Sequence, residues 1–231
     1  MGTAQQRRGA RLLMVARSDR FHDFEMLASH LERWLGDLPG SNLELERTTD
    51  RSRLSGDLTS FDVVCSLLRL GPEASEEEER ALVGFTNSGG GLLGVHGGLV
   101  LNRPPEPPLR PGMVELWGAR FAQHAPYGPF TVRIVDHNHP ITRGLSDFEV
   151  RDELFELEPL PPLGAHVLAE ADAHGVAQPM AYTKSHGRGS VYYCALGHDT
   201  ACWDHPAYQH LMTRGVGWLA AQALRARGQG G

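Results

Sequence analysis

Histidines stand where predicted strands end in this sequence, and His96 has the most distinctive setting. The apolar, glycine-rich run 89–95 indicates a buried strand, and His96 follows it directly, ahead of Gly97 and Gly98. Many α/β enzymes place a serine or cysteine nucleophile at such a glycine turn. An imidazole at this position is suited to bind a metal ion, move a proton or contact a ligand. We therefore expect His96 to lie at the centre of a functional site.

Three further histidines are predicted metal ligands together with His96, because each lies at or beside a strand end. These are His22, His124 and His198. Several imidazoles with carboxylates at one edge suit a divalent ion such as Zn, Mn, Ni or Fe. No short metal motif such as H-E-x-x-H is present, so the spacing alone gives weak support. Metal-free acid–base chemistry by the same residues stays open.

Two adjacent carboxylates, Asp152 and Glu153, complete the predicted catalytic set with His96. Acidic side chains beside an imidazole can take or orient a proton. A nucleophilic mechanism has no support, since neither serine nor cysteine occupies the glycine turn. The three cysteines are widely spaced and are typical of small buried apolar side chains or isolated thiols rather than of a zinc site.

Aromatic side chains could form a sugar-binding face, because aromatic rings stack on apolar faces of ligands. Each of them alone is more often a core residue. The predicted substrate-binding set is Trp117, Tyr127, Tyr182, Asp199 and Trp203.

Composition and charge bound the class of protein. The chain has 231 residues, of which 41% are hydrophobic and 22% charged, as expected for one globular domain. We place this domain at residues 11–224, with disordered tails at 1–10 and 225–231. The net charge of -6 and the absence of a basic run argue against a nucleic-acid partner. No apolar stretch reaches the ~20 residues that span a bilayer, so we expect a cytoplasmic protein without a membrane partner.

The first hundred residues predict a β-α-β-β-α-β order. Apolar runs at 12–16 and 61–68 indicate buried strands, and 42–48 alternates as a strand with one wetter face. Ser75 and Glu78 form a capping-box pattern at the start of a helix. This order is typical of a doubly wound, mostly parallel α/β sheet of flavodoxin-like type. It would bring His22 and His96 to the same carboxyl edge.

The second half of the chain mixes strands with turns. Five prolines between 102 and 112 predict a loop that could wall a pocket. The remaining predictions are a short helix at 114–121, a strand at 130–135, a structural turn at 137–141, a hairpin of 180–184 with 190–196, and a final helix from Pro206.

Five motifs in order resemble the ThuA-like family, named for trehalose utilisation. They are the run ending at His96, the segment 115–124, the segment 136–145, residues 152–155, and 186–199 ending in Leu196-Gly197-His198-Asp199. The resemblance implies a three-layer fold of the class I glutamine amidotransferase type without its nucleophile. It also implies a setting in sugar catabolism, often beside oxidoreductases that make 3-keto sugars. The phosphate-binding motif G-x-x-x-x-G-K-[ST] is absent, so we expect no nucleotide cofactor. A homodimer is expected by analogy with the fold.

Three functions are compatible with these observations. The first is an enzyme that acts on a 3-keto sugar or glycoside by metal-assisted proton abstraction, with elimination or isomerisation. The second is a sugar-binding or regulatory domain without catalysis. The third is a metal-dependent glycoside hydrolase. In each case the expected partner is a small sugar or glycoside.

Overall fold

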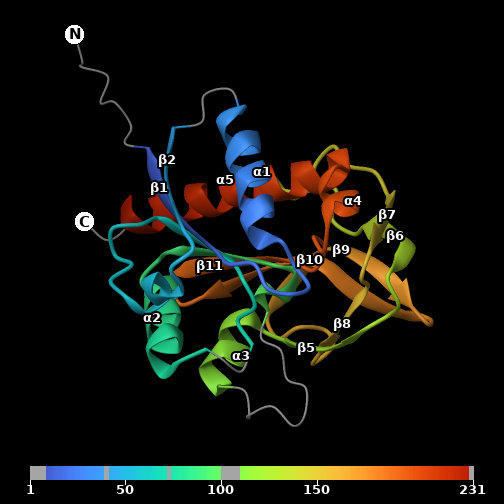
Figure 1. The fold of residues 1–231 in the computed structure, drawn as a ribbon, viewed down its shortest axis with the longest axis horizontal. Helices are drawn as coiled ribbons and strands as arrows, with labels where there is room; N and C mark the ends of the chain where they lie inside the picture. The colour runs from blue at the N-terminus through green and yellow to red at the C-terminus, as the bar shows by residue number, and fades with distance from the viewer. Residues whose placement is uncertain (1–8, 39–41, 72–73, 100–109, 229–231) are drawn as a thin grey trace.

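One large mixed sheet forms the centre of the molecule (Figure 1). The computed structural model describes residues 9–38, 42–71, 74–99 and 110–228, and the statements below concern these residues. The sheet has nine strands in the order β2-β1-β3-β4-β11-β10-β9-β6-β7. It divides into a parallel half and an antiparallel half, which meet where β11 lies beside β10.

The parallel half confirms the doubly wound order expected from the sequence. Its strands are β1 (Ala10–Ala16), β2 (Leu43–Thr48), β3 (Val63–Leu67), β4 (Gly91–Val95) and β11 (Gly189–Cys194). Neighbouring strands are parallel throughout. Every residue of β3 and β4 is buried, as expected for strands covered on both faces.

The antiparallel half continues the sheet from β10, and a separate pair of strands lies beside it. Its strands are β6 (Gly128–Ile134), β7 (Phe148–Asp152), β9 (Ala165–Ala173) and β10 (Val176–His186). The separate antiparallel pair is β5 (Arg120–His124) with β8 (Phe155–Glu158). The predicted hairpin is confirmed, because β10 pairs with β11 across the turn at Gly187.

Helices cover both faces of the sheet and give the expected three layers. On one side lie α1 (Phe24–Gly36) and α5 (Pro206–Gly228), and on the other lie α2 (Glu76–Asn87) and α3 (Pro111–Trp117) (Figure 1). The short helices are η1 (Arg51–Ser55), η2 (His96–Gly98) and α4 (Thr200–Trp203). None of the described helices is long and apolar enough to cross a membrane.

Local sequence signals fix the helix ends. The capping box of α2 is present as predicted, since the Ser75 side chain accepts from the Glu78 amide and the Glu78 carboxylate accepts from the Ser75 amide. The Glu78 carboxylate is buried and also pairs with Arg51 at 2.6 Å. Helix α1 begins after Asp23, whose carboxylate accepts from the Met26 amide at 3.0 Å.

Three boundaries differ from the sequence prediction. Strand β1 already begins at Ala10 and α5 continues to Gly228, so the predicted tails are too long at both ends. The helix expected at 114–121 is instead α3 followed by β5, because Gly118 adopts a left-handed conformation (φ 82°) that ends the helix. The rest of the two tails, and most of the predicted proline loop (100–109), lie outside the described residues.

Candidate metal and substrate site

A backbone elbow positions His96 at the end of β4, as the sequence predicts. His96 adopts φ 48°, a conformation that residues with a Cβ rarely take and that clusters at functional sites. The chain turns there into η2. Gly98 allows the turn, because a Cβ at this position would lie 2.8 Å from the carbonyl oxygen of Ser66. Close packing against the backbone of β3 therefore fixes the conformation of this elbow.

Hydrogen bonding leaves one nitrogen of His96 directed at the site. The side chain is fully buried, and its Nδ1 lies 2.8 Å from the Ala195 carbonyl oxygen. A carbonyl only accepts, so Nδ1 carries a proton and Nε2 is the nitrogen that faces the site. Burial lowers the pKa of His96, but the hydrogen bond to Glu153 and the charge of Asp152 outweigh it and raise the pKa above its usual value.

His22 and His198 reach the same point from two other strand ends. The His22 ring lies after β1, with ring centroids 5.0 Å from His96 and 5.2 Å from His198. Its Nδ1 is 3.1 Å from a carboxylate oxygen of Asp19, which orients the other nitrogen inward. Burial and the nearby His96 lower the pKa of His22 to about 4. The predicted meeting of His22 and His96 at the carboxyl edge is confirmed.

Glu153 faces these histidines from the antiparallel half. Its Oε2 lies 3.4 Å from His96 Nε2 and 3.5 Å from His198 Nδ1. Burial raises the pKa of Glu153, but the hydrogen bond from His96 and the charges of the surrounding histidines bring it down to about 2. The carboxylate is therefore ionised at neutral pH and offers negative charge to the cluster.

Four side chains together form the histidine cluster, defined as His22, His96, Glu153 and His198. Each offers one nitrogen or oxygen atom, and these atoms all lie within 4.8 Å of one another. Three imidazoles and one carboxylate are donors that Zn, Mn, Fe and Ni accept in proteins. His96 Nε2 and His198 Nδ1 are only 3.4 Å apart. Two nitrogen lone pairs this close repel each other unless a proton or a cation lies between them. The donor set fits a divalent metal ion.

Two predicted roles change in this geometry. His124 was expected among the metal ligands, but it lies outside the cluster, with Nε2 3.8 Å from Glu153 Oε1. Asp152 was expected to be catalytic, but its buried carboxylate accepts from the amides of Gly197 (2.7 Å), Glu153 (2.7 Å) and His198 (3.3 Å). These backbone donors occupy its oxygens. Asp152 is therefore a positioning residue that holds two cluster members in place.

Tyr127 and Asp199, two of the predicted substrate-binding residues, lie beside the histidine cluster. The Tyr127 hydroxyl donates to Asp199 Oδ2 at 2.8 Å, and its ring centroid is 5.6 Å from that of His198. Partial burial and the Asp199 carboxylate raise the pKa of Tyr127 to about 12. The Arg151 guanidinium stands 5.2 Å from the same ring. The phenol thus stays protonated and is held at one side of the cluster.

Trp117, Tyr182 and Trp203 are core residues, which corrects the predicted substrate-binding set. Each has at most 1% of its surface exposed. The Tyr182 hydroxyl donates to the Trp117 carbonyl at 2.9 Å, and the Trp203 indole donates to the Gly197 carbonyl at 2.8 Å. A ring without exposed surface cannot stack on a sugar, so we remove these three from the site.

Sequence reasoning missed two residues around His22. Phe21 is 53% exposed, and its ring is 6.1 Å from that of His22. Arg69 lies 6.0 Å from the Phe21 ring and 3.8 Å from Asp19. The adjacency of Phe21 to His22 is a signal that could have suggested the first. Arg69 follows β3, and only the parallel strand order brings it to this edge.

Comparisons with known proteins agree with the fold and family. The family model of ThuA, trehalose utilisation, matches residues 13–219. A structure described as ThuA-like, from Bacteroides uniformis ATCC 8492, has 19% identity and TM-score 0.76, covering 95% of this chain and 94% of that one. A second ThuA-like structure, from Parabacteroides merdae ATCC 43184, has 17% identity and TM-score 0.73, covering 92% and 90%.

More distant likenesses concern the fold alone. A GMP synthase component from Thermoplasma acidophilum has 15% identity and TM-score 0.58, covering 96% of this chain and 100% of that one. The search of curated proteins finds no match. The family model spans far more than half of the sequence, and the matching structures share its architecture. The chain belongs to the ThuA (trehalose utilisation) family.

Proposed function

We propose that this protein is a sugar-utilisation enzyme that removes a proton from a 3-keto sugar or glycoside with the help of a divalent metal ion. The observation that carries the proposal is the convergence of four donor atoms within 4.8 Å at the carboxyl edge of the parallel strands. Family membership supports a sugar as the substrate class. Ligands of open α/β sheets bind at this edge.

The histidine cluster would hold the metal ion through its three imidazoles and the Glu153 carboxylate. When bound there, a divalent ion would supply positive charge beside a substrate carbonyl and so stabilise the negative charge that develops when the neighbouring carbon is deprotonated. Asp19 and the Ala195 carbonyl fix the rings of His22 and His96, so the donors need little rearrangement.

His124 is our candidate for the base, in place of the sequence-based assignment to His96 or Glu153. Its Nδ1 lies 2.9 Å from the Ala125 carbonyl oxygen, so the proton sits on Nδ1 and Nε2 keeps its lone pair. Nε2 stands 3.8 Å from the Glu153 carboxylate, which stabilises the imidazolium once formed. About a third of the His124 side chain is exposed, and a bound sugar can therefore reach it.

The reaction we propose is an elimination across the glycosidic bond. The proton on the carbon between the keto group and the anomeric carbon moves to Nε2 of His124. The electron pair left behind forms a double bond to the anomeric carbon, and the glycosidic oxygen leaves. That oxygen then recovers the proton from the His124 imidazolium. Where the sugar has no leaving group, the same deprotonation leads to isomerisation. The proton then returns either to the opposite face of the carbon that lost it or, through the enediol, to the former keto carbon.

Phe21 and Tyr127 are our candidates for sugar contacts, in place of the three buried aromatic residues. Phe21 presents an exposed ring beside His22, whereas Tyr127 flanks His198 on another side. Aromatic faces bind the apolar faces of sugars, and the Asp199 carboxylate can accept from a hydroxyl group. These contacts would orient the keto group toward the cluster.

Product analysis with a 3-keto glucoside tests the proposal. We expect an unsaturated keto sugar and the free aglycone, formed by the wild type and by His137→Ala, whose exposed histidine lies in the turn after β6. His198→Ala should be inactive. A saturated 3-keto sugar carrying the elements of water would instead identify a hydrolase. Tight sugar binding without any product would identify a binding domain, and either result would contradict the proposed elimination.

A further inference from the structure

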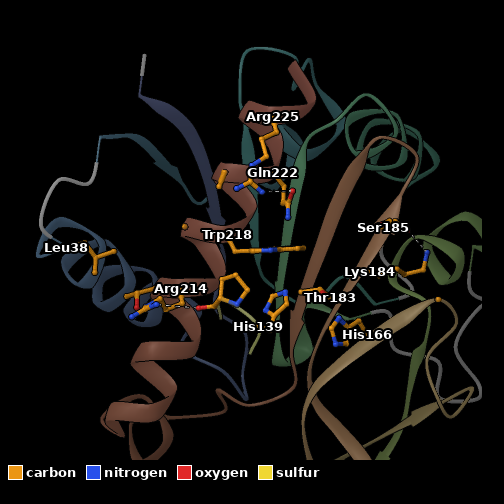
Figure 2. Close-up of a pocket in the computed structure, with 15 residues that line it drawn as sticks. Leu38, His139, His166, Thr183, Lys184, Ser185, Arg214, Trp218, Gln222 and Arg225 are labelled. Carbon is orange, nitrogen blue, oxygen red and sulfur yellow. Dashed lines mark hydrogen bonds between the residues drawn. The ribbon is translucent and has the colours of Figure 1, made fainter. Parts of the chain in front are cut away.

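A cavity of about 730 Å³ opens between α5 and the strands β9 and β10 (Figure 2). None of the described residues that line it belongs to the histidine cluster. Its walls come from one face of α5, from the carboxyl-terminal part of β10, and from the turn that follows β6. The volume falls within the range of small-molecule sites in proteins. The cavity is thus large enough for a monosaccharide with a substituent.

Positive charge is concentrated around this cavity. Among the described residues that line it none is acidic, whereas Lys184, Arg214 and Arg225 are basic. The whole chain carries a net charge of -6, so the local sign is opposite to that of the protein. Within the described chain neither Arg214 nor Arg225 has a carboxylate at ion-pair distance. Arg225 Nη1 instead lies 3.5 Å from Gln222 Oε1.

Trp218 gives the cavity an aromatic surface next to the Arg225 charge. Its indole reaches across from α5, with His139 on one side and with Gln222 and Arg225 on the other (Figure 2). The His139 and Trp218 ring centroids are 5.4 Å apart, which covers one side of the indole. Trp218, Gln222 and Arg225 follow at i, i+4 and i+7, the spacing of one helix face. The Trp218 ring and the Arg225 guanidinium can therefore contact one small ligand at the same time.

Charge argues against a second copy of this chain as the occupant. In a two-fold dimer the same patch meets itself. Pairing of this face with itself would bring arginines toward arginines without an acidic partner. A small anion with a ring to stack satisfies both features without this repulsion. The polar rim formed by Gln222 and Thr183 can hydrogen-bond hydroxyl groups.

We infer that this cavity, on the α5 face and separate from the histidine cluster, binds an anionic sugar, a pyranose that carries a phosphate or a carboxylate. The pyranose stacks on Trp218, the amide of Gln222 contacts its hydroxyls, and the guanidinium of Arg225 binds the anionic group. Guanidinium contacts to phosphate or carboxylate are among the stronger hydrogen bonds in proteins. This site does not depend on catalysis at the cluster.

Calorimetric titration with glucose 6-phosphate, glucuronate, glucose, AMP and inorganic phosphate tests this inference. We expect the wild type to bind glucose 6-phosphate or glucuronate at least tenfold more tightly than the other three compounds. Arg225→Gln should weaken this binding about tenfold, as expected for loss of one charge-assisted contact. Trp218→Ala should weaken it similarly. Arg80→Gln, an exposed arginine on α2, is the matched control and should have no effect.

Gly217→Gln tests the same cavity without removing the partly buried indole of Trp218. Gly217 lies on the exposed side of α5 and lines the cavity, and a Cβ added there meets no atom within 4 Å. Gly217→Gln should therefore fold and weaken binding by obstructing the cavity. His198→Ala should bind as the wild type does. Binding lost in His198→Ala, equal affinity for inorganic phosphate or AMP, or a dimer that Trp218→Ala dissociates would overturn the inference.

Discussion

The two halves of the sheet contribute different things to the histidine cluster. The parallel half supplies three imidazoles, because β1, β4 and β11 all end at one edge, where His22, His96 and His198 follow them. The antiparallel half and its neighbouring pair of strands supply Glu153 and, beside the cluster, His124 and Tyr127. The histidines of the cluster are thus brought together mainly by topology, whereas the proposed acid–base and sugar contacts depend on how strands distant in sequence pair.

Because the two halves contribute different residues to the site, they should respond differently to substitution. Changes in the parallel half should alter metal binding or the elbow that holds His96. Changes around His124 should alter chemistry while the metal stays bound. Asp152 connects the halves, since it lies at the end of β7 and accepts from the amides beside β11.

His124→Gln should give the largest effect and separates the two halves most clearly. Loss of a general base typically lowers turnover by about 10²–10⁴-fold. We expect a fall of that order in kcat on a 3-keto glucoside, with the metal content unchanged. Gln123→Ala, on the same strand and exposed, is the control and should keep full turnover. Metal lost together with activity in His124→Gln would make His124 a ligand and remove the proposed division.

Asp152→Ala should cost the most stability. The substitution leaves three buried or partly buried amides without their acceptor, and each unsatisfied donor costs about 1–3 kcal/mol. We expect the free energy of unfolding to fall by about 3 kcal/mol or more in denaturant titrations. Asp172→Ala removes an exposed turn carboxylate that accepts from one amide, and should cost less than about 1 kcal/mol. Similar losses in both variants would show that Asp152 does not join the two halves.

Gly98→Ala tests the elbow of the parallel half. The added Cβ would lie 2.8 Å from a backbone oxygen, which cannot move aside as a flexible side chain can. We expect a loss of about 1–3 kcal/mol in the free energy of unfolding. Gly84→Ala, on α2 with no atom within 4 Å of the added Cβ, should instead stabilise slightly. An unchanged stability of Gly98→Ala would mean that the elbow tolerates a side chain.

Ser75→Ala should have the smallest effect, because it removes a single capping hydrogen bond at the start of α2. It removes the hydroxyl that caps the Glu78 amide, a change worth about 1 kcal/mol of unfolding free energy. Ser75→Thr keeps the hydroxyl and should restore most of the loss. Neither variant should alter turnover. A capping change that lowers turnover would show that the parallel half and the site are coupled through α2.

The parallel half is the part of the fold that the sequence predicts well. Its strands are apolar runs bounded by polar or glycine residues, and its helices carry local caps such as Ser75 with Glu78. The carboxyl edge then follows from topology, which is why the sequence predicts that His22 and His96 meet there, whereas His198 is predicted only because it ends a strand. The helix end at Gly118 was missed because the sequence does not show whether a glycine adopts the left-handed conformation that ends a helix.

The remaining site residues depend on tertiary contacts that no local pattern carries. Asp152 and Glu153 are neighbours in sequence, yet one holds backbone amides and the other faces the histidines, because successive side chains leave a strand end in different directions. Trp117 is buried because its ring packs into the space that a side chain at Gly94 would fill, which the sequence does not reveal. Burial decides which aromatic rings a sugar can reach.

Metal stoichiometry of the untagged protein tests the central claim most directly. Elemental mass spectrometry would be applied to the wild type, to His96→Ala and His198→Ala, and to the control His137→Ala, each after dialysis against the same metal-containing buffer. The account predicts close to one divalent ion per chain in the wild type and in His137→Ala, and a loss of at least tenfold in the two cluster variants. Equal metal content in all four proteins, or none in the wild type, would contradict a metal centre at the histidine cluster.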